Sequence, residues 1–442
     1  MNNTLEFREG DLIRIRLPSG EVLEGIVMPA TEFSSRDVII IKLENGYNVG
    51  ICIKDAKIEV VKRAIVEVGR EAPMERTVIK GKGSHKILFL STGGTIMSRV
   101  EYETGAVRPA INATELAEMV PNIDEMVSEI HLIEMYRLLS ENLTPREWSN
   151  IALNVGNAFR DGFDAVIVAH GTDTMAYTAA AVAFAVRNAP GPTIFVGAQR
   201  SSDRPSTDAV LNLRASLITA CKAPFAESVV AMHGTTSDTY VLIHRGVKVR
   251  KMHSSRRDAF QSVNDYPLAK VTFPKGEFKL LNKRYIPREG DRSKLVLRPE
   301  FSDKVFLLKM FPGMPCDIID YLIDRGYKAI VIEGTGLGHI RDPCIKSIKR
   351  AIEEGLVVVM TTQTLFGRIN MKVYTTGRKL IKAGVLSADD MLPEVAYVKL
   401  SWLVGNYGSD AEKIKELFTS NLVNEINPIH DHRLYPRWYH GD

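Results

Sequence analysis

The sequence predicts a body of two α/β domains preceded by a small β-barrel. Short alternating strands crowd the first sixty or so residues, and from Lys86 onward apolar strands alternate with helical stretches. A polar break near 275–300 divides this second region. At 442 residues the chain has room for two or three domains.

The N-terminal region has the pattern of a small antiparallel domain. In DLIRIRL at 11–17, isoleucines alternate with Arg14 and Arg16, which is the period of a half-buried strand. PSGE and ENGY are turn signals, and VLEGIVM, DVIIIKL and YNVGICI are further strands. We predict an SH3-like or Sm-like β-barrel domain over 1–75, with a charged linker containing Gly and Pro from about 62 to 85.

The remaining chain has the pattern of βα units around mostly parallel sheets. The strands KILFL, DAVIVA, PTIFVG and SVVAM alternate with helices predicted over 144–160 and 174–188. The pattern resumes with KVFLLKM, KAIVIEG and LVVVMTT, with helices near 316–326 and 343–354. We predict α/β domains over 84–290 and 301–442.

Composition narrows the class of protein. A net charge of +4 is too small to indicate nucleic-acid or membrane binding by itself. The most apolar helical run, AAAVAFAV, is too short to span a bilayer, and the N-terminus lacks a secretory h-region, so we expect a cytoplasmic protein. Cys52, Cys221, Cys316 and Cys344 are scattered, so we expect reduced, buried cysteines and neither a disulfide frame nor a zinc site.

Two strand ends carry unusual chemistry, STGGTIM at 91–97 and AHGTDTMAYTA at 169–179. Ligands of α/β sheets bind beyond the carboxyl ends of strands, where glycines let a small ligand approach the backbone. The sequence contains no GxxxxGK[ST], HExxH or GxSxG motif, which argues against phosphate, metal and serine-elbow chemistry. A threonine nucleophile remains, activated by a lysine that a carboxylate orients.

STGGTI and HGTDTM together resemble the two signature motifs of the asparaginase/glutaminase family. The similarity covers roughly 85–425 and includes VGAQRSSDRPSTDAVLNLRAS, EGTGLGH and MTTQTLFGR. The resemblance implies a homodimeric or tetrameric amidohydrolase that uses threonine chemistry and no metal.

The resemblance also assigns catalytic residues by motif position. Thr95 corresponds to the nucleophilic threonine, and Thr92 would shape the turn. Thr172 and Asp173 correspond to the threonine–aspartate pair, and the catalytic lysine aligns with Lys251 in VRKMHSS, with Lys248 as the alternative.

Further residues are assigned to substrate binding. Ser140 and Glu141 in LLSENLTP fall where the family has a substrate-binding serine and its neighbour, and Glu141 would suit an α-ammonium group. Gly94 and Gly171 would let the substrate approach the backbone. Tyr102 is the candidate for the catalytic tyrosine of the family's mobile loop, although it lies closer to the nucleophilic threonine than that tyrosine usually does.

The implied mechanism is two-step acyl transfer. Lys251, oriented by Asp173, draws a proton through Thr172 or a water, and either Thr95 or Thr172 attacks the side-chain amide. Local roles are the alternative: Thr172 with Asp173, or Ser140, would be helix N-caps, Glu141 a first-turn carboxylate and Lys251 a solvated charge.

A small barrel ahead of such a body resembles the D-subunit family of the archaeal glutamyl-tRNA(Gln) amidotransferases. That resemblance implies hydrolysis of glutamine or asparagine to release ammonia, without a cofactor in this chain. A partner, the E subunit of the amidotransferase, would use ATP and magnesium to convert Glu-tRNA(Gln) to Gln-tRNA(Gln), and the chain would form a homodimer.

Two other functions fit the same sequence. One is a stand-alone cytosolic L-asparaginase with an appended domain. The other is an RNA-binding scaffold with an inert body, whose barrel would use Arg14 and Arg16, although alternating charge on a strand is usually only solvated.

Overall fold

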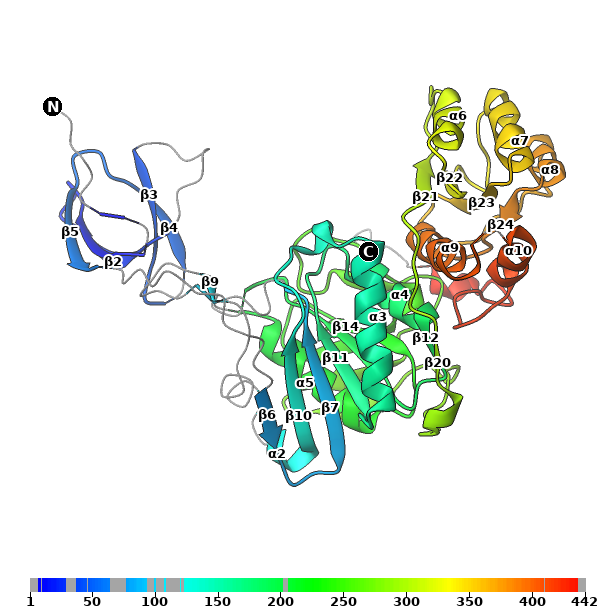
Figure 1. The fold of residues 1–442 in the computed structure, drawn as a ribbon. Coiled ribbons are helices and arrows are strands. Elements are labelled where there is room, and N and C mark those ends of the chain that lie inside the picture. The colour runs from blue at the N-terminus through cyan, green and yellow to red at the C-terminus, as the bar shows by residue number, and fades with distance from the viewer. Residues whose placement is uncertain are drawn as a thin grey trace.

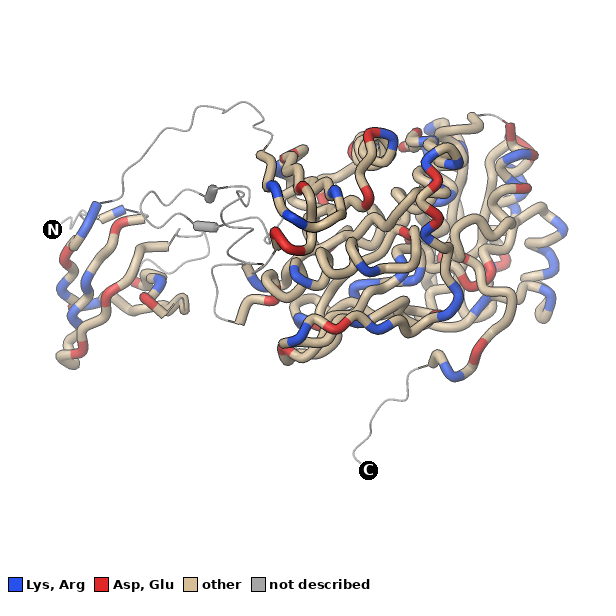
Figure 2. The backbone as a smooth tube through the Cα atoms, turned by 90° about the horizontal axis from the view of Figure 1, so that it is seen from below, with Lys and Arg blue, Asp and Glu red and all other residues tan. Residues whose placement is uncertain are grey.

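The computed structural model describes residues 7–8, 10–28, 37–45, 47–63, 77–93, 99–100, 107–108, 120, 123–201, 206–408 and 410–435. Most of its strands lie in three sheets of five, nine and four strands (Figure 1). None of the helices in these ranges is long and apolar enough to cross a membrane. Acidic and basic residues are interspersed over most of the described chain (Figure 2), in keeping with the small net charge.

The N-terminal sheet is antiparallel throughout, in the order β4-β3-β2-β1-β5. Its strands are β1 (Leu12–Arg16), β2 (Val22–Val27), β3 (Val38–Lys42), β4 (Asn48–Cys52) and β5 (Lys57–Lys62). Ile13 and Ile15 are buried while Arg14 and Arg16 are exposed, as their alternation predicts. The sheet curls around its own small core as a small barrel does, and its edge strands β4 and β5 are not paired with each other among the described residues.

The nine-stranded sheet has the order β19-β18-β15-β14-β13-β11-β7-β10-β6. The five strands from β10 to β14 are parallel, and the strands at both edges are antiparallel. The bounds are β6 (Thr77–Lys80), β7 (His85–Ser91), β10 (Val127–Glu134), β11 (Ala165–Ala169), β13 (Thr193–Val196), β14 (Ser228–His233), β15 (Tyr240–Arg245), β18 (Ala269–Thr272) and β19 (Glu277–Leu280).

Helices cover both faces of this sheet. Helices α3 (Pro145–Arg160) and α4 (Met175–Ala185) pack on one face, and α5 (Ala209–Lys222) packs on the other. Successive side chains of β7 point to opposite faces of the sheet, so Leu88 packs on the side of α3 and α4 while Phe89 packs on the side of α5. Helix α3 begins where Thr144 and Glu147 form a capping box.

The four-stranded sheet is wholly parallel, with the order β21-β22-β23-β24. It comprises β21 (Val305–Lys309), β22 (Ala329–Gly334), β23 (Val357–Thr362) and β24 (Leu386–Ser387). Helices α6 (Asp317–Asp324), α7 (Ile345–Glu353) and α8 (Thr375–Ala383) pack on one face. Helices α9 (Pro393–Tyr407) and α10 (Ala411–Thr419) cover the other, and α9 packs against α4, so one apolar core joins the two α/β regions.

The remaining elements are short. They are β8 (Arg99–Val100), β9 (Val107–Arg108), α2 (Ile123–Met126), η2 (Ser140–Asn142), β12 (Val186–Arg187), η3 (Gly246–Lys248), β16 (Val249–Lys251), β17 (Phe260–Ser262), η4 (Arg292–Lys294), β20 (Val296–Leu297), η5 (Asp342–Cys344) and η6 (His432–Leu434).

Two segments predicted as connections contain strands of the nine-stranded sheet. Thr77–Lys80, inside the predicted linker, is edge strand β6 and pairs antiparallel with β10. Glu277–Leu280, inside the predicted break, is the opposite edge strand β19. Both are four-residue edge strands with mixed exposure, so neither shows the apolar run by which central strands are recognised.

The prediction of four reduced, buried cysteines is wrong. Cys316 and Cys344 form a disulfide, and the free Cys52 is exposed. Cys316 precedes α6 and Cys344 precedes α7, and these two helices pack side by side after the adjacent strands β21 and β22. The pairing depends on this packing, which a separation of 28 residues does not reveal.

A buried histidine on β15 makes stability depend on pH. His244 is fully buried, and burial lowers its pKa to about 3. Histidine in the unfolded chain protonates near pH 6.5. Between that pH and about 3, the unfolded chain therefore binds one more proton than the folded chain, and the free energy of unfolding decreases as the pH is lowered. We expect His244→Asn to flatten this fall by roughly 1.4 kcal/mol per pH unit between about pH 6 and 4. Urea unfolding of both proteins across this range measures it, and parallel slopes would contradict the assignment.

Candidate active site

The carboxyl ends of β7, β11 and β13 lie at the same edge of the nine-stranded sheet, because these strands are parallel neighbours. Thr92 and Gly93 follow β7, and Gly171–Asp173 follow β11. The two predicted motifs therefore meet at one edge.

Lys251 completes a contact that the sequence only implied. Its Nζ donates hydrogen bonds to Thr172 Oγ1 at 3.0 Å and to Asp173 Oδ1 at 2.7 Å. The lysine comes from β16, 79 residues beyond the threonine, and its side chain is 13% exposed, whereas that of Asp173 is 67% exposed. An amine held between a hydroxyl and a carboxylate can take the hydroxyl proton once it is neutral.

The local alternatives for the second motif do not match the structure. The N-cap of α4 is Thr174, whose hydroxyl donates to the Ser140 carbonyl at 2.7 Å instead of capping the helix. Ser140 does not cap α3 either, since Thr144 does. Thr172 and Asp173 are thereby left free for Lys251 and a ligand.

Ser140 lies directly against Gly171. A Cβ atom on Gly171 would stand 2.8 Å from Ser140 Cβ and 2.9 Å from its Oγ. Ser140 is buried, while the adjacent Glu141 is exposed in the short helix η2. The predicted substrate-binding serine is thus beside the Thr172 loop, and Glu141 is its solvent-facing neighbour.

We expect Gly171→Ala to weaken substrate binding. The added methyl group must displace Ser140 or the loop that carries Thr172, because it would stand under 3 Å from the serine side chain. Misplacing either group should lower kcat/KM for side-chain amide hydrolysis by about tenfold or more. Ser140→Ala, which removes only the hydroxyl, is the matched variant, and both should raise KM. An unchanged KM in Gly171→Ala would mean that this contact does not place the substrate.

Thr92 occupies the turn position predicted for it. It is buried, and both its backbone N–H and its hydroxyl donate to the Ala169 carbonyl, at 3.0 and 3.1 Å. Gly93 has φ +106°, and a Cβ there would lie 2.4 Å from the Leu138 carbonyl oxygen, so only glycine fits. The other residues assigned to this loop, Gly94, Thr95 and Tyr102, lie outside the described residues and their roles stay predictions.

His170 is a site residue that the sequence reasoning did not single out, although it opens the HGTDTM motif. It is fully buried, with Nδ1 2.7 Å from the Gly171 carbonyl oxygen. Burial lowers its pKa to about 4, so near neutral pH the ring is uncharged and Nδ1–H donates to that carbonyl. His170 therefore fixes the backbone just before Thr172.

Lys248, the alternative lysine, is placed elsewhere. It is fully buried, and its Nζ donates to Asp390 Oδ2 at 2.9 Å, which ties the turn before β16 to the C-terminal α/β region. Within the described part of the chain, no three His, Cys, Asp or Glu side chains gather in a way that could hold a metal ion.

Comparisons with known proteins show which family the chain belongs to. Family models match residues 86–285 (Asparaginase, N-terminal), 304–418 (Glutaminase/Asparaginase C-terminal domain) and 7–61 (GatD N-terminal domain). The D subunit of the glutamyl-tRNA(Gln) amidotransferase of Metallosphaera sedula is 49% identical, covering 98% of this chain and 95% of that protein. The corresponding protein of Thermofilum pendens is 48% identical, covering 97% and 95%. The chain belongs to the D-subunit family of the glutamyl-tRNA(Gln) amidotransferases.

Two of the solved structures that this D-subunit family member resembles are L-asparaginases, and each covers about three quarters of the chain. The thermostable L-asparaginase from Thermococcus kodakarensis is 31% identical with a TM-score of 0.69, covering 77% of this chain and 99% of its own. L-asparaginase I from Vibrio cholerae is 26% identical with a TM-score of 0.66, covering 78% and 99%. The D-subunit relatives, in contrast, match nearly the whole chain, including the N-terminal sheet.

Proposed function

We propose that this chain is the amidase component of a tRNA-dependent amidotransferase. It hydrolyses the side-chain amide of glutamine or asparagine and supplies the ammonia used to convert Glu-tRNA(Gln) to Gln-tRNA(Gln). The contact of Lys251 with both Thr172 and Asp173 carries the amidase proposal. The amidotransferase role is supported by the near full-length identity to proteins named as D subunits of this enzyme.

The geometry supports two-step acyl transfer. Neutral Lys251 takes the Thr172 proton, either because Thr172 attacks the amide carbon itself or because it passes on the proton of Thr95. The attacking oxygen bonds to the carbonyl carbon, the C–N bond breaks, and ammonia leaves with a returned proton. Water then cleaves the acyl-enzyme ester. Asp173 keeps the lysine aimed at the hydroxyl, and backbone N–H groups of the glycine turns stabilise the oxyanion.

The wider assembly follows from the same proposal. The chain forms a homodimer in the cytoplasm and binds the E subunit of the amidotransferase, which holds Glu-tRNA(Gln) and uses ATP and magnesium. The chain itself needs no cofactor. Its N-terminal sheet, which the family model of the GatD N-terminal domain matches, contacts this partner or helps to order the complex.

The test is ammonia release from glutamine and asparagine, first by the chain alone and then with the E subunit, Glu-tRNA(Gln), ATP and magnesium. We expect weak release alone, a marked rise in the complete mixture, and loss in Thr172→Val, whose side chain keeps the shape but not the hydroxyl. Fast asparagine hydrolysis that the partner leaves unchanged would identify a stand-alone asparaginase. RNA binding without ammonia release in any mixture would identify the inert scaffold.

A further inference from the structure

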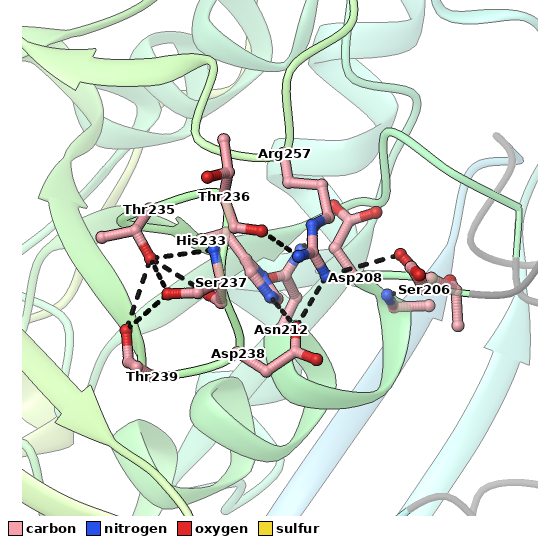
Figure 3. Close-up of polar contacts among 12 residues, drawn as sticks. Ser206, Asp208, Asn212, His233, Thr235, Thr236, Ser237, Asp238, Thr239 and Arg257 are labelled. Atoms are coloured by element: carbon pink, nitrogen blue, oxygen red, sulfur yellow. Dashed lines mark hydrogen bonds and ion pairs between the residues drawn. The ribbon is translucent and has the colours of Figure 1, made fainter.

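A second polar network, separate from the lysine–threonine contact, links Asp208, Asn212 and His233 to Asp238 and Arg257 (Figure 3). Asp208 is fully buried and accepts from the Gln199 backbone N–H at 3.0 Å, and Asn212 Nδ2 donates to the Gly197 carbonyl at 2.9 Å. These bonds hold the backbone that follows β13. That backbone touches the site, since a Cβ on Gly197 would lie 2.9 Å from Thr172 Cγ2.

The network continues through His233 at the end of β14. Because Asn212 Nδ2 is used by Gly197 and Asp208, Asn212 Oδ1 accepts from His233 Nδ1, at 2.7 Å. His233 Nε2 lies 3.3 Å from Asp238 Oδ1. Burial lowers the pKa of His233, so Nε2 carries a lone pair near neutral pH and does not attract the carboxylate. A cation also contacts the carboxylate of Asp238, whose side chain is 61% exposed.

Arg257 supplies that cation. Its Nη1 donates to Asp238 Oδ1 at 2.6 Å and to the Ser206 carbonyl at 3.4 Å, and its Nη2 donates to the Thr236 carbonyl. The side chain is only 12% exposed. One guanidinium thus joins three segments: its own turn, the loop between β14 and β15, and the segment before α5 (Figure 3).

The turn that carries Arg257 directly follows the lysine of the site, which is the last residue of β16. It connects β16 to β17, where Lys251 pairs with Phe260, and it is closed by a bond from the Met252 N–H to the Ala259 carbonyl at 2.7 Å. The turn therefore moves with the lysine. We propose that Arg257 is a positioning residue that sets the distance between Lys251 Nζ and Thr172 Oγ1, an inference that rests on the proposed amidase function.

Arg257→Gln tests this proposal through the kinetics of ammonia release. Loss of the guanidinium frees the hairpin from the neighbouring loops, and small misplacements of a catalytic group cost about 10–100-fold. We expect kcat to fall by that amount with KM nearly unchanged, since Arg257 is not expected to touch the substrate. Arg257→Lys keeps the positive charge but not the forked set of N–H donors, so its kcat should lie between that of the wild type and that of Arg257→Gln.

Arg256→Gln is the matched control. Arg256 is the adjacent arginine, but both hydrogen bonds of its guanidinium go to Asp258 within the same turn, so Arg256→Gln should leave kcat at the wild-type value. Asp238→Asn combined with Arg257→Gln should be no worse than Arg257→Gln alone, because the two side chains act as one link. Additive losses, or equal kinetics for the variants of Arg256 and Arg257, would overturn the proposal.

Hydrogen exchange separates this proposal from the proposed function. Exchange of peptides covering 249–262 and 234–239 should speed up in Arg257→Gln and not in Arg256→Gln, whether or not the wild type releases ammonia. If the wild type is inactive but the exchange pattern is as described, the amidase function is refuted, while the structural role of Arg257 in joining the β16–β17 turn to the neighbouring loops stands. An active wild type with unchanged exchange in Arg257→Gln would refute the link alone.

Discussion

Replacing Lys251 with leucine is expected to reduce ammonia release by about 10²–10⁴-fold, the usual contribution of a general base. The threonine hydroxyl keeps its proton without an amine beside it, so the attacking oxygen remains a weak nucleophile. Stability should change little, because the partner carboxylate of Asp173 is exposed and such pairs contribute at most about 1 kcal/mol. Steady-state ammonia release and the thermal midpoint together measure both effects.

Lys251→Arg distinguishes a base from a fixed charge. Arginine can reach Asp173 and keeps the positive charge, but its guanidinium does not lose a proton in proteins. We therefore expect this variant to be as inactive as Lys251→Leu. An active arginine variant would mean that Lys251 acts only as a charge and that another group takes the proton.

Lys248→Met is expected to lower the free energy of unfolding by about 3–5 kcal/mol, the cost of leaving a buried charge without its partner. Lys248 and Asp390 are both buried, and Asp390 also accepts from the backbone N–H and the side-chain amide of Asn427. Removing the lysine leaves that carboxylate in the core with the more distant Arg368 guanidinium, at 3.9 Å, in place of the ammonium at 2.9 Å. Urea unfolding followed by intrinsic fluorescence measures the loss.

Two further variants serve as controls for the effect of Lys248→Met on stability. Lys413→Met removes an exposed ion pair with Glu416 and should cost less than about 1 kcal/mol. Lys248→Met combined with Asp390→Leu removes both charges and should recover much of the lost stability. If Lys248→Met costs no more than Lys413→Met, the buried pair does not hold the two regions together.

Much of the candidate site could be predicted because its motifs lie at strand ends. Thr172 and Asp173 are adjacent in sequence, and parallel strands bring their loop beside Thr92 without further information. Lys251 required the family resemblance, since nothing in its local sequence separates it from Lys248. The structure separates them by burial, because the ammonium of Lys248 is enclosed with Asp390 and that of Lys251 faces the threonine.

Apart from His170, whose partner is the adjacent Gly171, the main features that sequence reasoning missed depend on contacts between distant segments. The disulfide needs α6 and α7 to be neighbours, and strand β6 is recognisable only by its pairing with β10. The bonds of Arg257 cross 51 and 19 residues to Ser206 and Asp238. Local propensity carries no information about such pairs, whereas α3 is evident from its capping box and amphipathic period.

The division of the apolar core has a consequence for how the chain unfolds. Helices α4 and α9 belong to one hydrophobic cluster, so each α/β region buries part of its apolar surface against the other. The two regions should therefore unfold in one cooperative transition. Among the described residues, the N-terminal sheet has a separate cluster whose buried members are Ile13, Ile15, Val27, Ile39, Ile41 and Ile51. So small a core supports little stability by itself. Calorimetry should therefore record a small heat-absorption peak for this sheet below the main one, and the catalytic region would outlast its N-terminal extension on heating.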